Sequence, residues 1–74
     1  MKDIYEIKKN GEDTWYFKNN LIHRDNDLPA AIIRDGQKEM WYQNGNLHRI
    51  GKPAVIAQAF SYELGYEEWW NEGK

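Results

Sequence analysis

The chain has 74 residues, enough for one small domain, and it carries a formal net charge of −2 with a pI near 5.6. A domain of this size buries only about 60% of the surface that its unfolded chain exposes, so its core needs support. The absence of cysteine excludes disulfides, thiolate metal sites and thiol nucleophiles, and it suits a reducing cytoplasm. The acidic balance disfavours a nucleic-acid-binding protein, because such proteins usually display a basic patch.

Aromatic residues supply 15% of the chain, including four Trp and five Tyr, and rings of this size are the expected source of the core. No stretch approaches the roughly 20 consecutive apolar residues of a membrane-spanning helix. The start of the chain also has no apolar run of signal-peptide length. We therefore expect a cytoplasmic protein that does not enter a membrane.

Self-similarity is the most informative feature of the sequence, because landmarks in a fixed order predict repeated structural units. Each of two complete units contains an Asn-Gly or Asp-Gly pair, a Trp-Tyr pair, a His-Arg pair and a Pro-Ala pair, in this order. One copy covers about residues 10–33, a second about 35–56, and a partial third 65–74. Because Trp, Tyr, Ile and Val favour strands while Asn-Gly and Asp-Gly favour tight turns, each copy predicts a β-hairpin.

In the first copy, a predicted strand over residues 5–7 turns at Asn10-Gly11 into the strand that contains Trp15. A three-residue loop at Lys18–Asn20 is then expected to return the chain. This loop length places Trp15 directly opposite His23 on the paired strands.

A strand predicted over residues 30–33, at the end of the first copy, is joined at an Asp-Gly turn to a strand predicted over residues 38–41 in the second copy. A two-residue turn at Asn44-Gly45 then brings the chain back. This turn places Trp41 opposite His48, so both copies predict a Trp across from a His.

The stretch from residue 57 to residue 64 has no clear period, and it predicts either a strand with a long loop, which is favoured, or a short helix. Chained together, the hairpins predict an all-β fold: one domain over residues 1–74, with an antiparallel meander of about six strands made from two and a half hairpin repeats.

Residues Trp41–Arg49 and Pro53-Ala54 resemble the MORN-repeat-variant family, whose β-hairpin repeats show a Trp-Tyr, Asn-Gly, Leu-His-Arg and Pro-Ala pattern. The resemblance covers about residues 10–56 and, more weakly, the partial third copy. Such repeats occur in bacterial, phage and large-virus proteins and resemble scaffolds and interaction surfaces without shared chemistry. The chain departs from the family's acidic-Gly turn before Pro-Ala, with Gly51-Lys52 in the second copy and Asn26–Leu28 in the first.

The His-Arg pairs, at residues 23–24 and 48–49, are the most chemically suggestive feature. Neighbouring strand residues point to opposite faces, so a His and its Arg are not expected to act on one substrate. For each His, a structural contact with a ring and a turn is favoured over a ligand-contacting role and over catalysis. No Ser, Cys or acid recurs to complete a triad, and two His alone make a poor zinc site. We expect no catalytic residue, metal or cofactor.

Adjacent aromatic residues place rings on both faces of a single sheet, and a short chain has little material to cover the second face. Trp, Tyr and Arg are enriched at binding hot spots, so one aromatic face is the expected partner site. The residues predicted to bind a partner are Trp15, Tyr16, Arg24, Trp41, Tyr42, His48, Arg49, Trp69 and Trp70.

The favoured function is a small non-enzymatic module that binds another protein. By analogy with the phage proteins of the resembled family, it would be a phage-encoded inhibitor that covers the surface of a host protein or defence complex in the bacterial cytoplasm. One alternative is a repeat protein that self-associates, as a homodimer or larger, through open sheet edges. Another is a protein that sequesters a nucleotide or other small ligand in a pocket built by His48, Arg49 and a nearby Trp.

Overall fold

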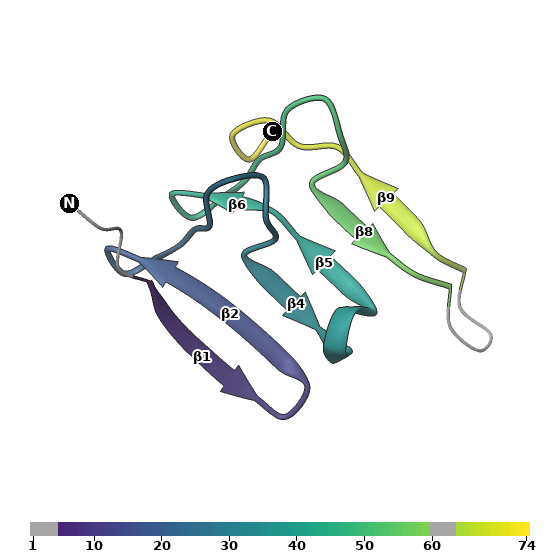
Figure 1. Ribbon diagram of the computed structural model, residues 1–74. Helices are drawn as coiled ribbons and strands as arrows, with labels where there is room; N and C mark the ends of the chain where they lie inside the picture. The colour runs from purple at the N-terminus through teal and green to yellow at the C-terminus, as the bar shows by residue number, and fades with distance from the viewer. Residues whose placement is uncertain (1–4, 60–63) are drawn as a thin grey trace.

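The computed structural model describes residues 5–59 and 64–74, and it shows an antiparallel β-sheet with the strand order β1-β2-β4-β5-β8-β9 (Figure 1). A short strand, β3, pairs with β2 as the seventh member, and β6 and β7 form a separate two-stranded sheet. The strands are β1 (Glu6–Asn10), β2 (Asp13–Lys18), β3 (Leu21–Ile22), β4 (Ala31–Ile33), β5 (Lys38–Met40), β6 (Tyr42–Gln43), β7 (Asn46–Leu47), β8 (Val55–Ala57) and β9 (Tyr66–Glu68). The predicted all-β meander is confirmed.

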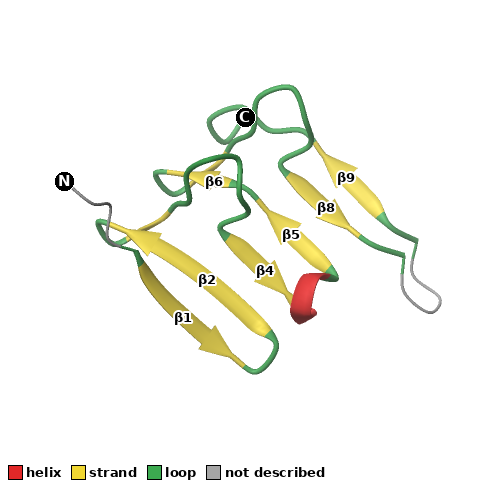
Figure 2. Ribbon diagram, in the orientation of Figure 1, coloured by secondary structure: helices red, strands yellow, loops and turns green. Residues whose placement is uncertain are grey.

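One 3-10 turn, η1 (Arg34–Gly36), joins β4 to β5 and is the only helical segment in the described residues (Figure 2). The stretch from residue 57 to residue 64 was predicted as either a strand with a long loop or a short helix. Ala57 ends β8, and Gln58 and Ala59 have no regular structure. The remainder of the helix-or-strand prediction, at residues 60–63, lies outside the described residues. The fold measures 45 × 29 × 16 Å, as expected for a thin sheet.

The predicted register is right in the second hairpin and wrong in the first. Tyr42 pairs with Leu47, and the His48 amide donates to the Trp41 carbonyl at 3.0 Å. In the first hairpin, Phe17 pairs with Ile22, and the His23 amide donates to the Tyr16 carbonyl at 3.0 Å. Tyr16, and not Trp15, therefore stands across from the first His.

The physical reason for the corrected register is the turn at Asn19 and Asn20, which has two residues and not three. Both Asn residues have positive φ, 53° and 66°, which is the backbone that a two-residue hairpin turn requires. Asn reaches this region more easily than most residues because its short side chain bonds locally. The insertion expected in the first hairpin does not exist, and Tyr16-Phe17 is the counterpart of Trp41-Tyr42.

The buried core lies at the starts of β4 and β8 and at Trp41, and it is built largely from alanine. Ala30 and Ala54 are fully buried. The Tyr16 amide donates to the Ala30 carbonyl and the Trp41 amide to the Ala54 carbonyl, both at 2.8 Å. The Pro-Ala motif thus supplies a small residue at the point where the chain passes closely under an aromatic residue.

Candidate interaction groove

Consecutive hairpins are joined by hydrogen bonds between one turn and the preceding His. The Asn44 amide donates to His23 Nδ1 at 2.9 Å, and the Glu72 amide donates to His48 Nδ1 at 3.0 Å. A second bond accompanies each one, from the Gly45 amide to the Ile22 carbonyl and from the Gly73 amide to the Leu47 carbonyl. The two His side chains are therefore hydrogen-bond acceptors that hold the next turn in place.

The two repeated Arg residues cover the aromatic rings of their own hairpins. The guanidinium carbon lies 3.8 Å from the Tyr16 ring centroid for Arg24 and 3.7 Å from the Trp41 ring centroid for Arg49. In each case Nη1 also donates to the carbonyl of the following proline at 3.1 Å. Both arginines are thus held by a cation–π contact and a backbone bond.

The surroundings of the two His differ in one respect that matters for the site. His23 Nδ1 is an acceptor, so its Nε2 carries the proton and donates to Asp25 Oδ1 at 2.7 Å. Asp25 also accepts from the Tyr5 hydroxyl at 2.8 Å and from Lys18 Nζ at 3.3 Å. The hydrogen bond from His23, followed by that from Tyr5, lowers the pKa of Asp25 from 3.8 to about 2.

Among the residues that the structure describes, His48 has no such carboxylate partner, because Ile50 occupies the position that Asp25 holds in the first hairpin. Its Nδ1 accepts the Glu72 amide, and its Nε2 has no hydrogen-bond partner among residues 5–59 and 64–74. The Ile50 side chain is 84% exposed. The second hairpin thus has an imidazole N–H and an apolar side chain at the place where the first hairpin has a hydrogen-bonded His23–Asp25 pair.

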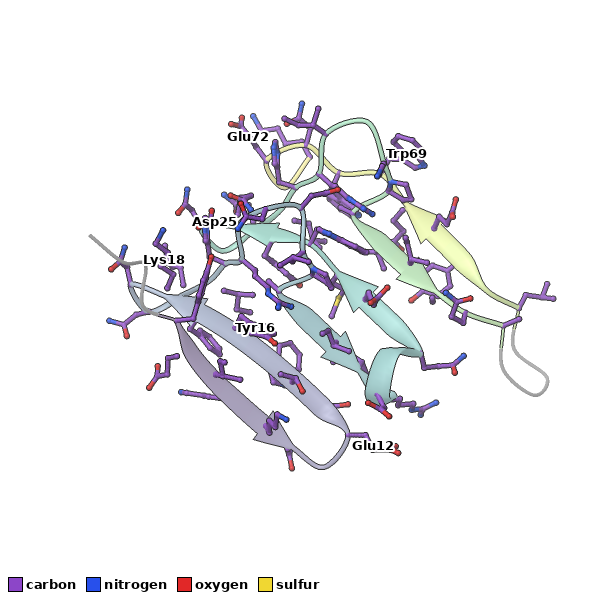
Figure 3. The ribbon with its side chains drawn as sticks, viewed as in Figure 1. Glu12, Tyr16, Lys18, Asp25, Trp69 and Glu72 are labelled. Atoms are coloured by element: carbon purple, nitrogen blue, oxygen red, sulfur yellow. The ribbon has the colours of Figure 1, made fainter. Side chains whose placement is uncertain are left out.

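An open groove of about 730 Å³ lies beside this imidazole, and we call it the His48 groove. Glu72, which lies on the C-terminal turn (Figure 3), is among the residues that line this groove. Its lining residues are Asp27, Trp41, Gln43, Asn44, Asn46, His48, Arg49, Ile50, Glu72 and Lys74.

His48 and Arg49 line the same groove, although strand alternation predicted opposite faces. The reason is that β7 ends at Leu47, so the alternation of a regular strand does not continue through the His-Arg pair.

The main charged groups in the His48 groove, Arg49 and Asp27, are already bonded to each other. Arg49 Nε donates to Asp27 Oδ1 at 2.8 Å and Nη2 to Oδ2 at 3.3 Å. These hydrogen bonds lower the pKa of the Asp27 carboxyl, with a weaker contribution from Lys52. The Trp41 ring lies under this pair, and its Nε1 donates to the Asp27 carbonyl at 3.0 Å.

Three of the predicted partner-binding residues, Trp41, His48 and Arg49, come together in the His48 groove, and Trp41 is buried there. Trp69 stands apart at the end of β9, where it is 63% exposed (Figure 3). It lines a second hollow of about 590 Å³. The others, Trp15, Tyr16, Arg24, Tyr42 and Trp70, are partly buried.

Sequence reasoning missed several lining residues of the groove. Asp27 and Ile50 follow the His-Arg pairs in loops that differ between the copies. A comparison of those loops was a signal that could have found them. Glu72 and Lys74 carried no such signal, because their place depends on how the C-terminal turn packs against the second hairpin.

Comparisons with family models, with curated proteins and with solved structures found no match. Within residues 5–59 and 64–74, no group of three metal-ligating side chains comes together. Over the same residues, no helix has the length and apolar character needed to cross a membrane. The candidate site is therefore defined by its geometry.

Proposed function

We propose that the protein is a non-enzymatic protein-binding module and that its partner docks in the His48 groove. The observation that carries this proposal is the pairing of an imidazole N–H at His48 with the exposed side chain of Ile50 on one rim. Protein–protein interfaces combine buried apolar side chains with hydrogen bonds at polar groups around them. The surface fits a partner segment that offers an apolar side chain to Ile50 and a hydrogen-bond acceptor to His48.

A protein partner suits the groove better than a nucleotide or another small anion. Phosphate recognition commonly uses the fork of an arginine, but Arg49 already gives Nε and Nη2 to Asp27 and Nη1 to the Pro53 carbonyl. Its guanidinium also lies over the Trp41 ring, with the guanidinium carbon 3.7 Å from the ring centroid. A phosphate would have to displace Asp27 and the packing beneath it, whereas a protein segment can use Ile50 and His48 with these bonds intact.

The resemblance to MORN-repeat-variant hairpins, which occur in phage proteins, supports a more specific form of the proposal. The module would act in the bacterial cytoplasm by covering the surface of a host protein or defence complex. No chemical step is needed for such an effect, since an inhibitor of this kind only has to stay bound.

Site-specific photo-crosslinking in bacterial cells tests the proposal. A photoreactive residue is placed at Ile50, and a matched control carries it at Leu64, because the two side chains are 84% and 89% exposed. We expect a discrete adduct from position 50 that is absent from position 64. Unmodified protein should compete for this adduct, and the Ile50→Lys variant should not. Identical adducts from both positions, or none from position 50, would refute the proposed docking site.

A further inference from the structure

The sheet ends in two open edges of different composition. In the described part of the chain, β1 pairs only with β2, and β9 pairs only with β8. These strands lie at opposite ends of the sheet (Figure 1). Every residue of both strands is exposed. An edge strand of this kind has unpaired backbone N–H and C=O groups along its outer side, which can pair with another strand.

Charged residues of opposite sign stand at the two ends of the same side-chain rows. One row runs through successive strand pairs as Lys8, Trp15, Ala31, Met40, Val55 and Glu68. The neighbouring row runs on the other face as Lys9, Thr14, Ile32, Glu39, Ile56 and Glu67. Each row therefore begins with a lysine at the β1 edge and ends with a glutamate at the β9 edge.

The directions of the edge strands permit a continuation of the sheet. All neighbouring strands are antiparallel, so β1 and β9, at the ends of an even-numbered path, run in opposite directions. A second copy placed beyond β9 in the same orientation would present its β1 antiparallel to β9. It would thereby extend the pattern that already holds within one chain.

From these features we infer that copies of this chain associate head to tail, with β1 of one copy added to β9 of another. In the register that continues both rows, Glu68 faces Lys8 of the second copy and Glu67 faces its Lys9. The same register sets Trp69 beside Ile7 of the second copy, which joins side chains that are 63% and 53% exposed in the single chain. Both charged pairs and the apolar pair arise together.

Other registers do not give this match. A shift of one residue brings opposite faces of the two sheets together, because side chains alternate along a strand. A shift of two residues in one direction sets Glu68 opposite Glu6, and a shift of two in the other sets Glu68 opposite Asn10. Pairing of β9 with β9 would bring glutamates together, which repel. Pairing of β1 with β1 about Ile7 would set Glu6 opposite Lys8 of the second copy, but it would leave the exposed glutamates and Trp69 at the β9 edge without partners. The heterologous contact is the one that uses both edges, and it leads to an open series or a ring.

The experiment measures mass against concentration by analytical ultracentrifugation, for the full chain and two edge variants. One variant carries Lys8→Glu with Lys9→Glu, and the other carries Glu67→Lys with Glu68→Lys. The small area of a single edge contact makes the association weak, so the range extends from about ten micromolar to about one millimolar. Because all four positions are exposed, the variants should fold, and circular dichroism verifies this. The single reversals Lys9→Glu and Glu67→Lys serve if a double variant does not fold.

We expect the mass of the wild type to rise above 8.9 kDa with concentration, and each variant alone to remain monomeric. An equimolar mixture of the two variants should regain the association, because each then meets an edge of opposite charge. A monomeric wild type over the whole range would overturn the inference. So would association of either variant alone, or a mixture that stays monomeric. The Ile50→Lys variant should associate like the wild type. This control distinguishes failure of the edge contact from failure of the proposed partner docking in the His48 groove.

Discussion

Replacement of His23 by alanine should be far more damaging than the same change at His48. His23 is buried and makes two hydrogen bonds, one with the Asn44 amide and one with the Asp25 carboxylate. A bond between neutral groups contributes about 1 kcal/mol and one to a charged group about 1.5–3 kcal/mol. The lower value applies here, because the Asp25 side chain is 34% exposed. We therefore expect His23→Ala to lower the free energy of unfolding by about 2–3 kcal/mol.

The expected loss at His48 is smaller because, within the described parts of the chain, this side chain makes a single hydrogen bond, which it accepts from the Glu72 amide. We expect about 1 kcal/mol for His48→Ala. A domain of 74 residues has a total stability of about 4–11 kcal/mol at roughly 0.05–0.15 kcal/mol per residue. The His23 variant would thus lose a large part of it and melt roughly 10–20 °C lower.

Urea unfolding followed by tryptophan fluorescence gives both free energies, and thermal melting by circular dichroism gives the temperature shifts. The matched controls are His23→Asn and His48→Asn, since an Asn oxygen can take the place of Nδ1 as acceptor. His48→Asn should be close to wild type, whereas His23→Asn should recover only the turn bond. If His23→Ala is no more destabilising than His48→Ala, the reasoning about the Asp25 contact is wrong.

Three further outcomes follow from the same contacts. As the pH falls, the unfolded chain binds a proton at Asp25 before the folded chain does, since the pKa of this carboxyl is lowered from 3.8 to about 2 in the folded chain. The stability that Asp25 contributes should therefore be present above about pH 4 and lost between about pH 4 and 2. Urea titrations across that range should show a weaker pH dependence for Asp25→Asn. Ile50→Asp should stabilise the protein by about 0.5–1 kcal/mol, because it offers His48 Nε2 the carboxylate that His23 already has; no gain in the denaturation midpoint would refute this. Ala54→Leu should destabilise the protein by about 1–3 kcal/mol, because Ala54 is fully buried beside Trp41, and a wild-type melting temperature would contradict the close approach at that alanine.

The parts of the fold that could be predicted are those fixed by local chemistry. The Asn44-Gly45 turn was enough to place Trp41 across from His48, because Asn and Gly both readily take the positive φ that a two-residue hairpin turn requires. The first hairpin was predicted one residue out of register, because Asn19 and Asn20 are a weaker turn signal than Asn-Gly. The sequence did not reveal that both would take left-handed backbone.

The candidate site was predictable only in part, for a related reason. Trp41, His48 and Arg49 were recognised because their motif repeats, and they do meet in one groove. Their common location depends on β7 ending before His48, which a strand pattern does not show. The remaining wall comes from Glu72, whose amide reaches His48 across a separation of 24 residues, and such a contact has no local signature.

The hydrogen bond from each turn to the imidazole of the preceding hairpin determines how such a chain can change in length. The bonds at Asn44 and at Glu72 join only immediate neighbours, so the domain behaves as a one-dimensional array of coupled units. The turn of a duplicated unit inserted between two others would bond to the His Nδ1 of the unit before it, and its own His Nδ1 would accept the turn of the unit after it. Growth or loss by whole hairpins therefore leaves every other junction intact, whereas a fractional insertion would break two.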